Sequence, residues 1–195
     1  MVTALVEKVK GFLTNPVDTF RQSKEEGTDA VFPYFIMLLL LHAALSAVLA
    51  ALAIEILPMA GMITWGHSGP VVVFFVSLVT GFAGILVFGA WLHLWVYIFG
   101  GRRGIRQTMK AVMYGDTPFL LFGWIPFIGF VIVLWSLVLG ILGIRELQET
   151  SSLKAILAVA LAVMIPLILL LILAAYFMIA SATATMVPEP VVSHL

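Results

Sequence analysis

Hydrophobic residues occur along this chain in long runs, separated by short segments that carry nearly all the charges. The runs cover residues 32–56, 71–99, 111–122, 127–144 and 153–180. A helix needs about 20 apolar residues to cross the roughly 30 Å hydrocarbon core of a bilayer. The pattern therefore predicts an all-α fold, a polytopic membrane helix bundle with one transmembrane helix for each of the five runs.

Two polar segments flank the predicted bundle of residues 31–180. Residues 1–30 predict two short amphipathic helices, because one helical face collects Val2, Leu5, Val6, Val9, Phe12 and Leu13 and a second helix can start at Asn15-Pro16. We expect the first helix to lie in the membrane surface with its apolar side down. The tail, residues 181–195, is polar and contains prolines, so we expect it to be flexible and external.

The composition agrees with a membrane protein and excludes several kinds of site. The chain has 195 residues, of which 63% are hydrophobic and 10% are charged. Soluble domains have about 45–50% apolar and about 25% charged residues. Because the chain contains no cysteine, disulfides and thiolate metal sites are excluded. We expect membrane lipids as the main partners and no nucleic-acid partner.

The placement of the basic residues predicts the orientation. All ten Lys and Arg residues lie before the first run, between the second and third runs, or between the fourth and fifth. Five crossings put these three segments on one face, and basic loops lie on the cytoplasmic side. The N-terminus is then cytoplasmic and the C-terminus external.

The short third run leaves a second arrangement open, because it contains Asp116 and Pro118. Residues 107–122 form roughly 24 Å of helix, which crosses only with tilt or local thinning. The third and fourth runs can instead form a re-entrant hairpin, which also keeps every basic residue on one face. A full crossing is favoured because re-entrant segments are rare and need protein or water around them.

Ionisable residues within the runs are the first candidates for a site. His93 and Asp116 each lie six residues from the nearer cytoplasmic end of their runs, so they predict a buried polar pair at matching depth. Such a pair can act as a proton or ion relay, or it can join two helices structurally. The structural interpretation is the simpler one.

The loop between the second and third runs is the second candidate. Its basic residues Arg102, Arg103, Arg106 and Lys110 are expected to contact anionic lipid headgroups or a partner protein. Small residues such as Ala43, Ala47 and Ala51 favour close helix packing within the chain, with a homo-oligomer as the alternative.

No catalytic motif is present. The sequence lacks HExxH, GxSxG and a Walker lysine motif, and residues 100–104 lack the GK[ST] ending of a phosphate-binding loop. We therefore expect no enzymatic activity, no metal site and no cofactor.

The segment FGGRRGIRQTMKAVMYGDTPFLLFGWIPFIGFVIVLWSLVLGILGIRE resembles the core of the YIP domain family, the Ypt-interacting proteins. The resemblance rests on the order and spacing of several elements, including Gly100, Gly101, Pro118 and Pro126. It implies five transmembrane helices with a cytosolic N-terminus. For eukaryotic members it also implies binding to Rab-type small GTPases in ER–Golgi traffic.

Those eukaryotic members usually carry a long cytosolic N-terminal region, whereas about thirty residues precede the first run here. The chain is more similar to a compact prokaryotic member, which implies the plasma membrane; a eukaryotic member implies the ER or Golgi. The leading hypothesis is a non-enzymatic membrane scaffold or adaptor linked to membrane trafficking or organisation. The second is a small-molecule or lipid transporter, because a short helix broken near Asp116 and Pro118 is typical of segments that line a cavity.

Overall fold

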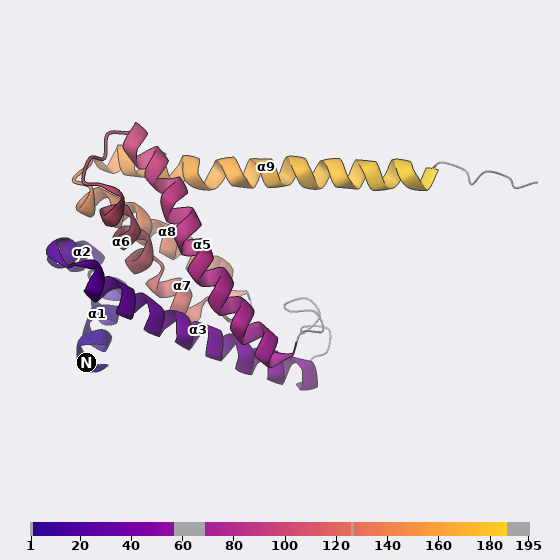
Figure 1. Cartoon of the computed structure of the whole chain (residues 1–195), viewed down its shortest axis with the longest axis horizontal. Helices are drawn as coiled ribbons and strands as arrows, with labels where there is room; N and C mark the ends of the chain where they lie inside the picture. The colour runs from indigo at the N-terminus through magenta and orange to yellow at the C-terminus, as the bar shows by residue number, and fades with distance from the viewer. Residues whose placement is uncertain (1, 57–68, 126, 187–195) are drawn as a thin grey trace, which may run out of the picture.

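The computed structural model describes residues 2–56, 69–125 and 127–186, and every regular element in these ranges is a helix (Figure 1). Short helices α1 (Val2–Thr14) and α2 (Pro16–Gln22) and the 3-10 helix η1 (Ser23–Glu25) precede α3 (Thr28–Ile56). There follow α5 (Pro70–Ile98), α6 (Ile105–Gly115), α7 (Thr117–Phe122), α8 (Ile128–Leu147) and α9 (Ser152–Met186). The predicted all-α fold class is confirmed.

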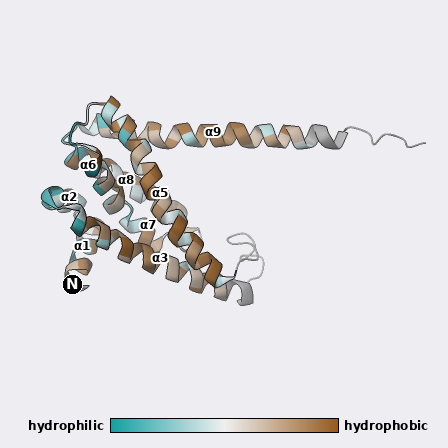
Figure 2. Ribbon diagram, in the orientation of Figure 1, coloured by the Kyte–Doolittle hydropathy of each residue, from teal (hydrophilic) through white to brown (hydrophobic). Residues whose placement is uncertain are grey.

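Four helices are long and apolar enough to cross a membrane, over Thr28–Leu52, Pro70–Ile98, Ile128–Leu147 and Ser152–Ser181. Figure 2 shows their hydrophobic surfaces, with hydrophilic residues gathered at the end of the bundle that α2 and α6 form. Helices α6 and α7 have 11 and 6 residues, so neither crosses alone. A fifth crossing needs both of them together, and it stays a prediction.

Helices α6 and α7 form one broken helix that packs between α3, α5 and α8. The break lies at Asp116, and its cause is Pro118, which has no N–H to bond the Tyr114 carbonyl. The Thr117 hydroxyl donates to that carbonyl instead, at 2.6 Å. The Phe119 N–H donates to the Ser136 hydroxyl of α8, at 3.1 Å. Side chains thus replace the backbone bonds that the proline removes.

The first thirty residues pack against the bundle, and the position of the first helix in the membrane surface stays a prediction. Phe12 and Phe20 are fully buried, although Val6 on the same stripe is 57% exposed. The Phe12 ring stacks on Tyr114 of α6 at 4.7 Å between centroids and meets Phe20 edge-on at 4.9 Å. The sequence shows the apolar stripe, but only the fold shows that its Phe12 packs on Tyr114.

Helix α9 packs against the bundle only through its first half and then extends away from it (Figure 1). Its buried residues are Ala155, Ala158, Val159 and Ala162. Pro166 leaves the Ala162 carbonyl without its helical donor, and the Trp91 indole of α5 donates to that carbonyl at 2.9 Å. The helix continues to Met186, past the predicted end at residue 180, and residues 187–195 lie outside the described residues.

Replacing Phe12 by alanine tests whether the N-terminal helices belong to the folded body. We expect Phe12→Ala to lower the free energy of unfolding by about 3–5 kcal/mol, because it leaves a cavity against Tyr114. Val6→Ala on the exposed side of α1 should change it by less than about 1 kcal/mol. Denaturant unfolding in detergent measures both. Equal losses for the two variants would contradict the packing of α1 on the bundle.

Candidate functional site

Ion pairs hold together one end of the bundle, formed by α1, α2, η1 and the loops at 99–104 and 148–151, which we call the basic end. The Arg21 Nε donates to Glu146 Oε2 at 2.9 Å. Glu149 accepts hydrogen bonds from both Arg103 and Lys24. These two bonds lower the pKa of the Glu149 carboxyl to about 2. The pairs join the three basic segments that the sequence distributes over the chain.

Gln148 is the centre of a buried hydrogen-bond network beneath these ion pairs. Its amide nitrogen donates to the Gly104 carbonyl at 2.8 Å and to Thr108 Oγ1 at 2.9 Å. Its amide oxygen accepts from the Arg103 N–H at 3.0 Å. Thr108 Oγ1 also bonds His93 Nδ1 at 2.8 Å. The network fixes the ends of α5, α6 and α8 to one another. Gln148 is not among the residues that the sequence pattern indicates, because nothing in the sequence distinguishes it from other polar loop residues.

Two glycines in the loop between α5 and α6, Gly100 and Gly101, allow this loop to lie close to Gln148. Gly100 has φ +93°, a conformation that favours glycine. A Cβ on Gly101 would lie 2.5 Å from Val96 Cγ1 and 3.2 Å from Gln148 Oε1. A larger residue at Gly101 would therefore displace the loop from Gln148, and one at Gly100 would strain the backbone.

Lys110 does not form part of the surface, which corrects its predicted contact with lipid headgroups or a partner. It is 3% exposed, and its ammonium donates to the carbonyls of Lys24 and Glu26 at 2.7 and 2.8 Å. Beside it, Glu26 accepts from Lys8 at 2.6 Å and from the Tyr114 hydroxyl. Burial raises the pKa of Glu26, but the bonds from Lys8 and Tyr114 outweigh it, so that pKa lies below its usual range.

Of the four basic residues predicted to contact headgroups or a partner, Arg102 and Arg106 have exposed side chains and take no part in the ion pairs. The Arg102 guanidinium lies 4.0 Å from the Tyr97 ring centroid and donates to the Tyr97 carbonyl. The Arg106 side chain is exposed and has no hydrogen bond or ion pair among the described residues. Arg103 is exposed, but its guanidinium is bound to Glu149. Arg102 and Arg106 are therefore the loop residues best placed to contact headgroups.

The structure does not bring the predicted polar pair together. His93 bonds Thr108, and eight residues of helix, or roughly 12 Å, separate Thr108 from Asp116. No hydrogen bond or ion pair joins His93 and Asp116 in the described ranges. The predicted matching depth of His93 and Asp116 requires a third helix that starts near Lys110, whereas α6 starts five residues earlier at Ile105. This earlier start brings Thr108 level with His93.

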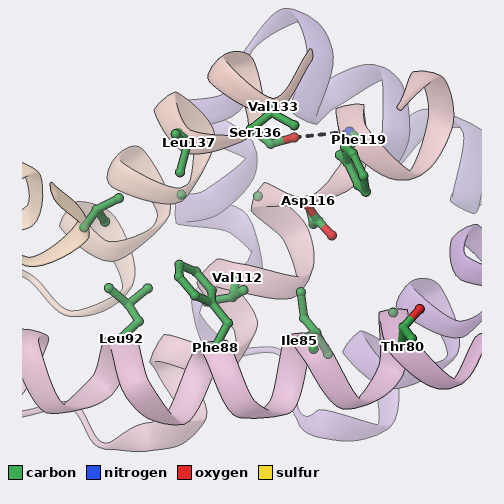
Figure 3. A pocket seen from close by; sticks show the side chains of 15 residues that line it. Thr80, Ile85, Phe88, Leu92, Val112, Asp116, Phe119, Val133, Ser136 and Leu137 are labelled. Carbon is green, nitrogen blue, oxygen red and sulfur yellow. Dashed lines mark hydrogen bonds between the residues drawn. The ribbon is translucent and has the colours of Figure 1, made fainter. Parts of the chain in front are cut away.

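Asp116 instead lines a cavity of about 320 Å³ between α5, α6, α7, α8 and α9 (Figure 3). The walls are mainly apolar, with Ile85, Phe88 and Val133 among them. Thr80 and Ser136 supply the other polar side chains that line it. Figure 3 shows the Asp116 carboxyl group projecting from the α6–α7 junction into this space.

The remaining predicted positions concern the helix break and metal binding. Pro118 is buried in the first turn of α7, whereas Pro126 lies outside the described residues. In the described part of the chain, no group of three or more His, Cys, Asp or Glu could hold a metal ion.

The apolar helices and their arrangement define an integral, multi-pass helical membrane protein. The profile of the Yip1 domain matches residues 10–186, nearly the whole chain. The chain therefore belongs to the Yip1 domain family, and the resemblance inferred from its loop and helix motifs is confirmed. No match was found among curated proteins or among solved structures.

The lowered pKa of Glu149 predicts how the basic end responds to acid. Its folded pKa of about 2 lies below the ordinary 4.5, so its contribution to stability is present above pH 4.5 and is lost as the pH falls toward 2. A spin label on Thr3→Cys, in a chain without native cysteine, should become mobile over that interval.

The Glu149→Gln variant should show a more mobile label already at pH 7 and a smaller acid transition. Glu7→Gln, an exposed position on α1, is the matched control and should behave as wild type. A label whose mobility in Glu149→Gln equals wild type at every pH would show that these ion pairs do not hold the N-terminal helices.

Proposed function

We propose that this protein is a non-enzymatic membrane scaffold or adaptor that recruits a partner or organises anionic lipid at its basic end. The main support for this proposal is that three basic segments far apart in the sequence are joined at one end of the bundle, which forms a platform there. The ion pairs of Glu146 and Glu149 and the network around Gln148 build that platform. Such a platform holds the backbone at Arg102 and Arg106 in place, which lowers the entropic cost of binding through their side chains.

The proposed orientation places the basic end in the cytoplasm and the C-terminus outside, with α6 and α7 together making the fifth crossing. All ten basic residues then lie on the cytoplasmic side. Membership of the Yip1 domain family supports a role in membrane trafficking or organisation. A small GTPase is the protein partner that the family resemblance suggests, and anionic headgroups are the lipid partner that the charges suggest.

Removing the charges of Arg102 and Arg106, the two loop arginines outside the ion-pair network, tests the recruitment role. We expect Arg102→Gln/Arg106→Gln to reduce co-purifying anionic lipid or partner protein severalfold, because each basic residue near an anionic surface contributes about 1 kcal/mol. Arg103 is left intact because it belongs to the ion-pair network. Lipid and protein mass spectrometry of the chain purified from native membranes measures the change.

The charge-preserving Arg102→Lys/Arg106→Lys is the matched control and should retain most of the headgroup binding. Identical lipids and proteins recovered with wild type and the glutamine variant would contradict recruitment through this loop.

Reporter fusions and cysteine labelling test the orientation. Fusions after Lys24, Arg103 and Lys154 should report the cytoplasm, and a fusion after Leu195 should report the outside. A single cysteine at Ile125 should react with an impermeant maleimide from outside if α6 and α7 cross the membrane together. A re-entrant hairpin would leave this position inaccessible from outside, and a cytoplasmic C-terminus would contradict both arrangements.

Transport or lipid translocation is the second candidate, and the cavity beside Asp116 favours it. A carboxyl group in an apolar cavity of a membrane protein is typical of a substrate or ion pathway. Flux measurements in liposomes would separate this role from a scaffold that only binds.

A further inference from the structure

The cavity beside Asp116 lies between α5 and α8, two of the helices that are long and apolar enough to cross the membrane. A Cβ added to Gly84 of α5 or to Gly140 of α8 would meet nothing within 4 Å. At the back of the cavity, in contrast, a Cβ on Gly115 would lie 3.0 Å from the Gly140 backbone nitrogen. Helices α6 and α8 are thus tightly packed at Gly115, whereas Gly84 and Gly140 border open space. Its volume of about 320 Å³ lies within the range of small-molecule sites, roughly 300–1,000 Å³.

Asp116 supplies the single ionisable side chain among the residues that line this space. Its carboxyl group has no hydrogen bond or ion pair in the described part of the chain, although its backbone N–H and carbonyl are bonded. An unpaired carboxylate in apolar surroundings costs several kcal/mol, so it needs a cation or a proton. His93, which could have supplied the cation, is bonded to Thr108 instead.

The cavity opens toward the surface that faces the lipid. Thr80, Gly84 and Val133 line it and are also exposed on the outside of the bundle. Thr80 is the eleventh of the 29 residues of α5, so this opening lies well inside the span. A ligand that enters here has to be dissolved in the membrane first.

We propose that this cavity binds a cationic amphiphile from the membrane, with its apolar body between α5 and α8 and its protonated amine on the Asp116 carboxylate. Apolar walls and a single carboxylate match such a ligand in both shape and charge. The Thr80 hydroxyl also lines the cavity and, although it donates to the Val76 carbonyl at 2.6 Å, it keeps lone pairs that can accept a hydrogen bond. The site rests on the cavity alone and does not depend on recruitment at the basic end.

Two probes of equal chain length separate charge recognition from apolar filling. Dodecylamine and dodecanol are added to the full chain in detergent, and native mass spectrometry and the thermal midpoint report binding. We expect one dodecylamine per chain with an affinity about tenfold above that of dodecanol. Asp116→Asn keeps the shape and removes the charge, so it should bring the two affinities within about twofold of each other.

Filling the cavity tests the location of the site. Gly84→Leu and Gly140→Leu each place a side chain in open space and should weaken binding of both probes at least tenfold. Ala83→Leu is the matched control, because Ala83 is an exposed neighbour that does not line the cavity, and it should bind as wild type. The thermal midpoint without probe shows which variants are folded.

Equal affinity of dodecylamine and dodecanol for the wild type would overturn the proposal, and so would an amine preference that survives Asp116→Asn. Binding that persists in a folded Gly84→Leu or Gly140→Leu variant would place the amphiphile elsewhere and would also overturn it. Loss of headgroup recruitment in the arginine variants has no bearing on these outcomes, so the two proposals fail separately.

Discussion

Polar side chains buried on α6 and α7 have to be bonded by the protein, and the rest of the structure depends on this constraint. Thr108, Lys110, Tyr114 and Thr117 are all nearly inaccessible. Leaving such groups without partners costs several kcal/mol each in apolar surroundings. The partners come from four other parts of the chain: His93 on α5, Gln148 after α8, the segment at residues 24–26, and Tyr34 on α3.

This demand explains why the first thirty residues belong to the body of the protein. The carbonyls of Lys24 and Glu26 satisfy Lys110, and the Glu26 carboxylate receives the Tyr114 hydroxyl. Phe12, stacked on Tyr114, and Phe20 are fully buried beside these bonds. This charge-rich segment thus packs on the broken helix formed by α6 and α7. Most of the charges at this end of the bundle are paired within the chain.

Asp116, at the junction of the broken helix, differs from the four buried polar residues of this helix, because its carboxyl group faces an open cavity rather than a partner. Proline creates this situation: Pro118 breaks the helix, and the bonds of Thr117 and Phe119 to nearby groups satisfy the backbone around it. The break leaves the preceding carboxylate at the junction. The basic end and the cavity are therefore two sites at opposite ends of α6, one satisfied internally and one that still needs a cation or proton.

The amino-acid sequence by itself determined the fold class, the four long apolar helices and the family, because hydropathy and motif order are local properties of the chain. It also located the break near Pro118, since proline removes a backbone donor wherever it stands. Only the tertiary structure decided the partners. Thr108 rather than Asp116 bonds His93 because α6 begins at Ile105, directly after Gly104, whose carbonyl accepts a hydrogen bond from Gln148. Lys110 is buried because the N-terminal helices fold over it. Such contacts join residues far apart in sequence, and no local pattern encodes their register.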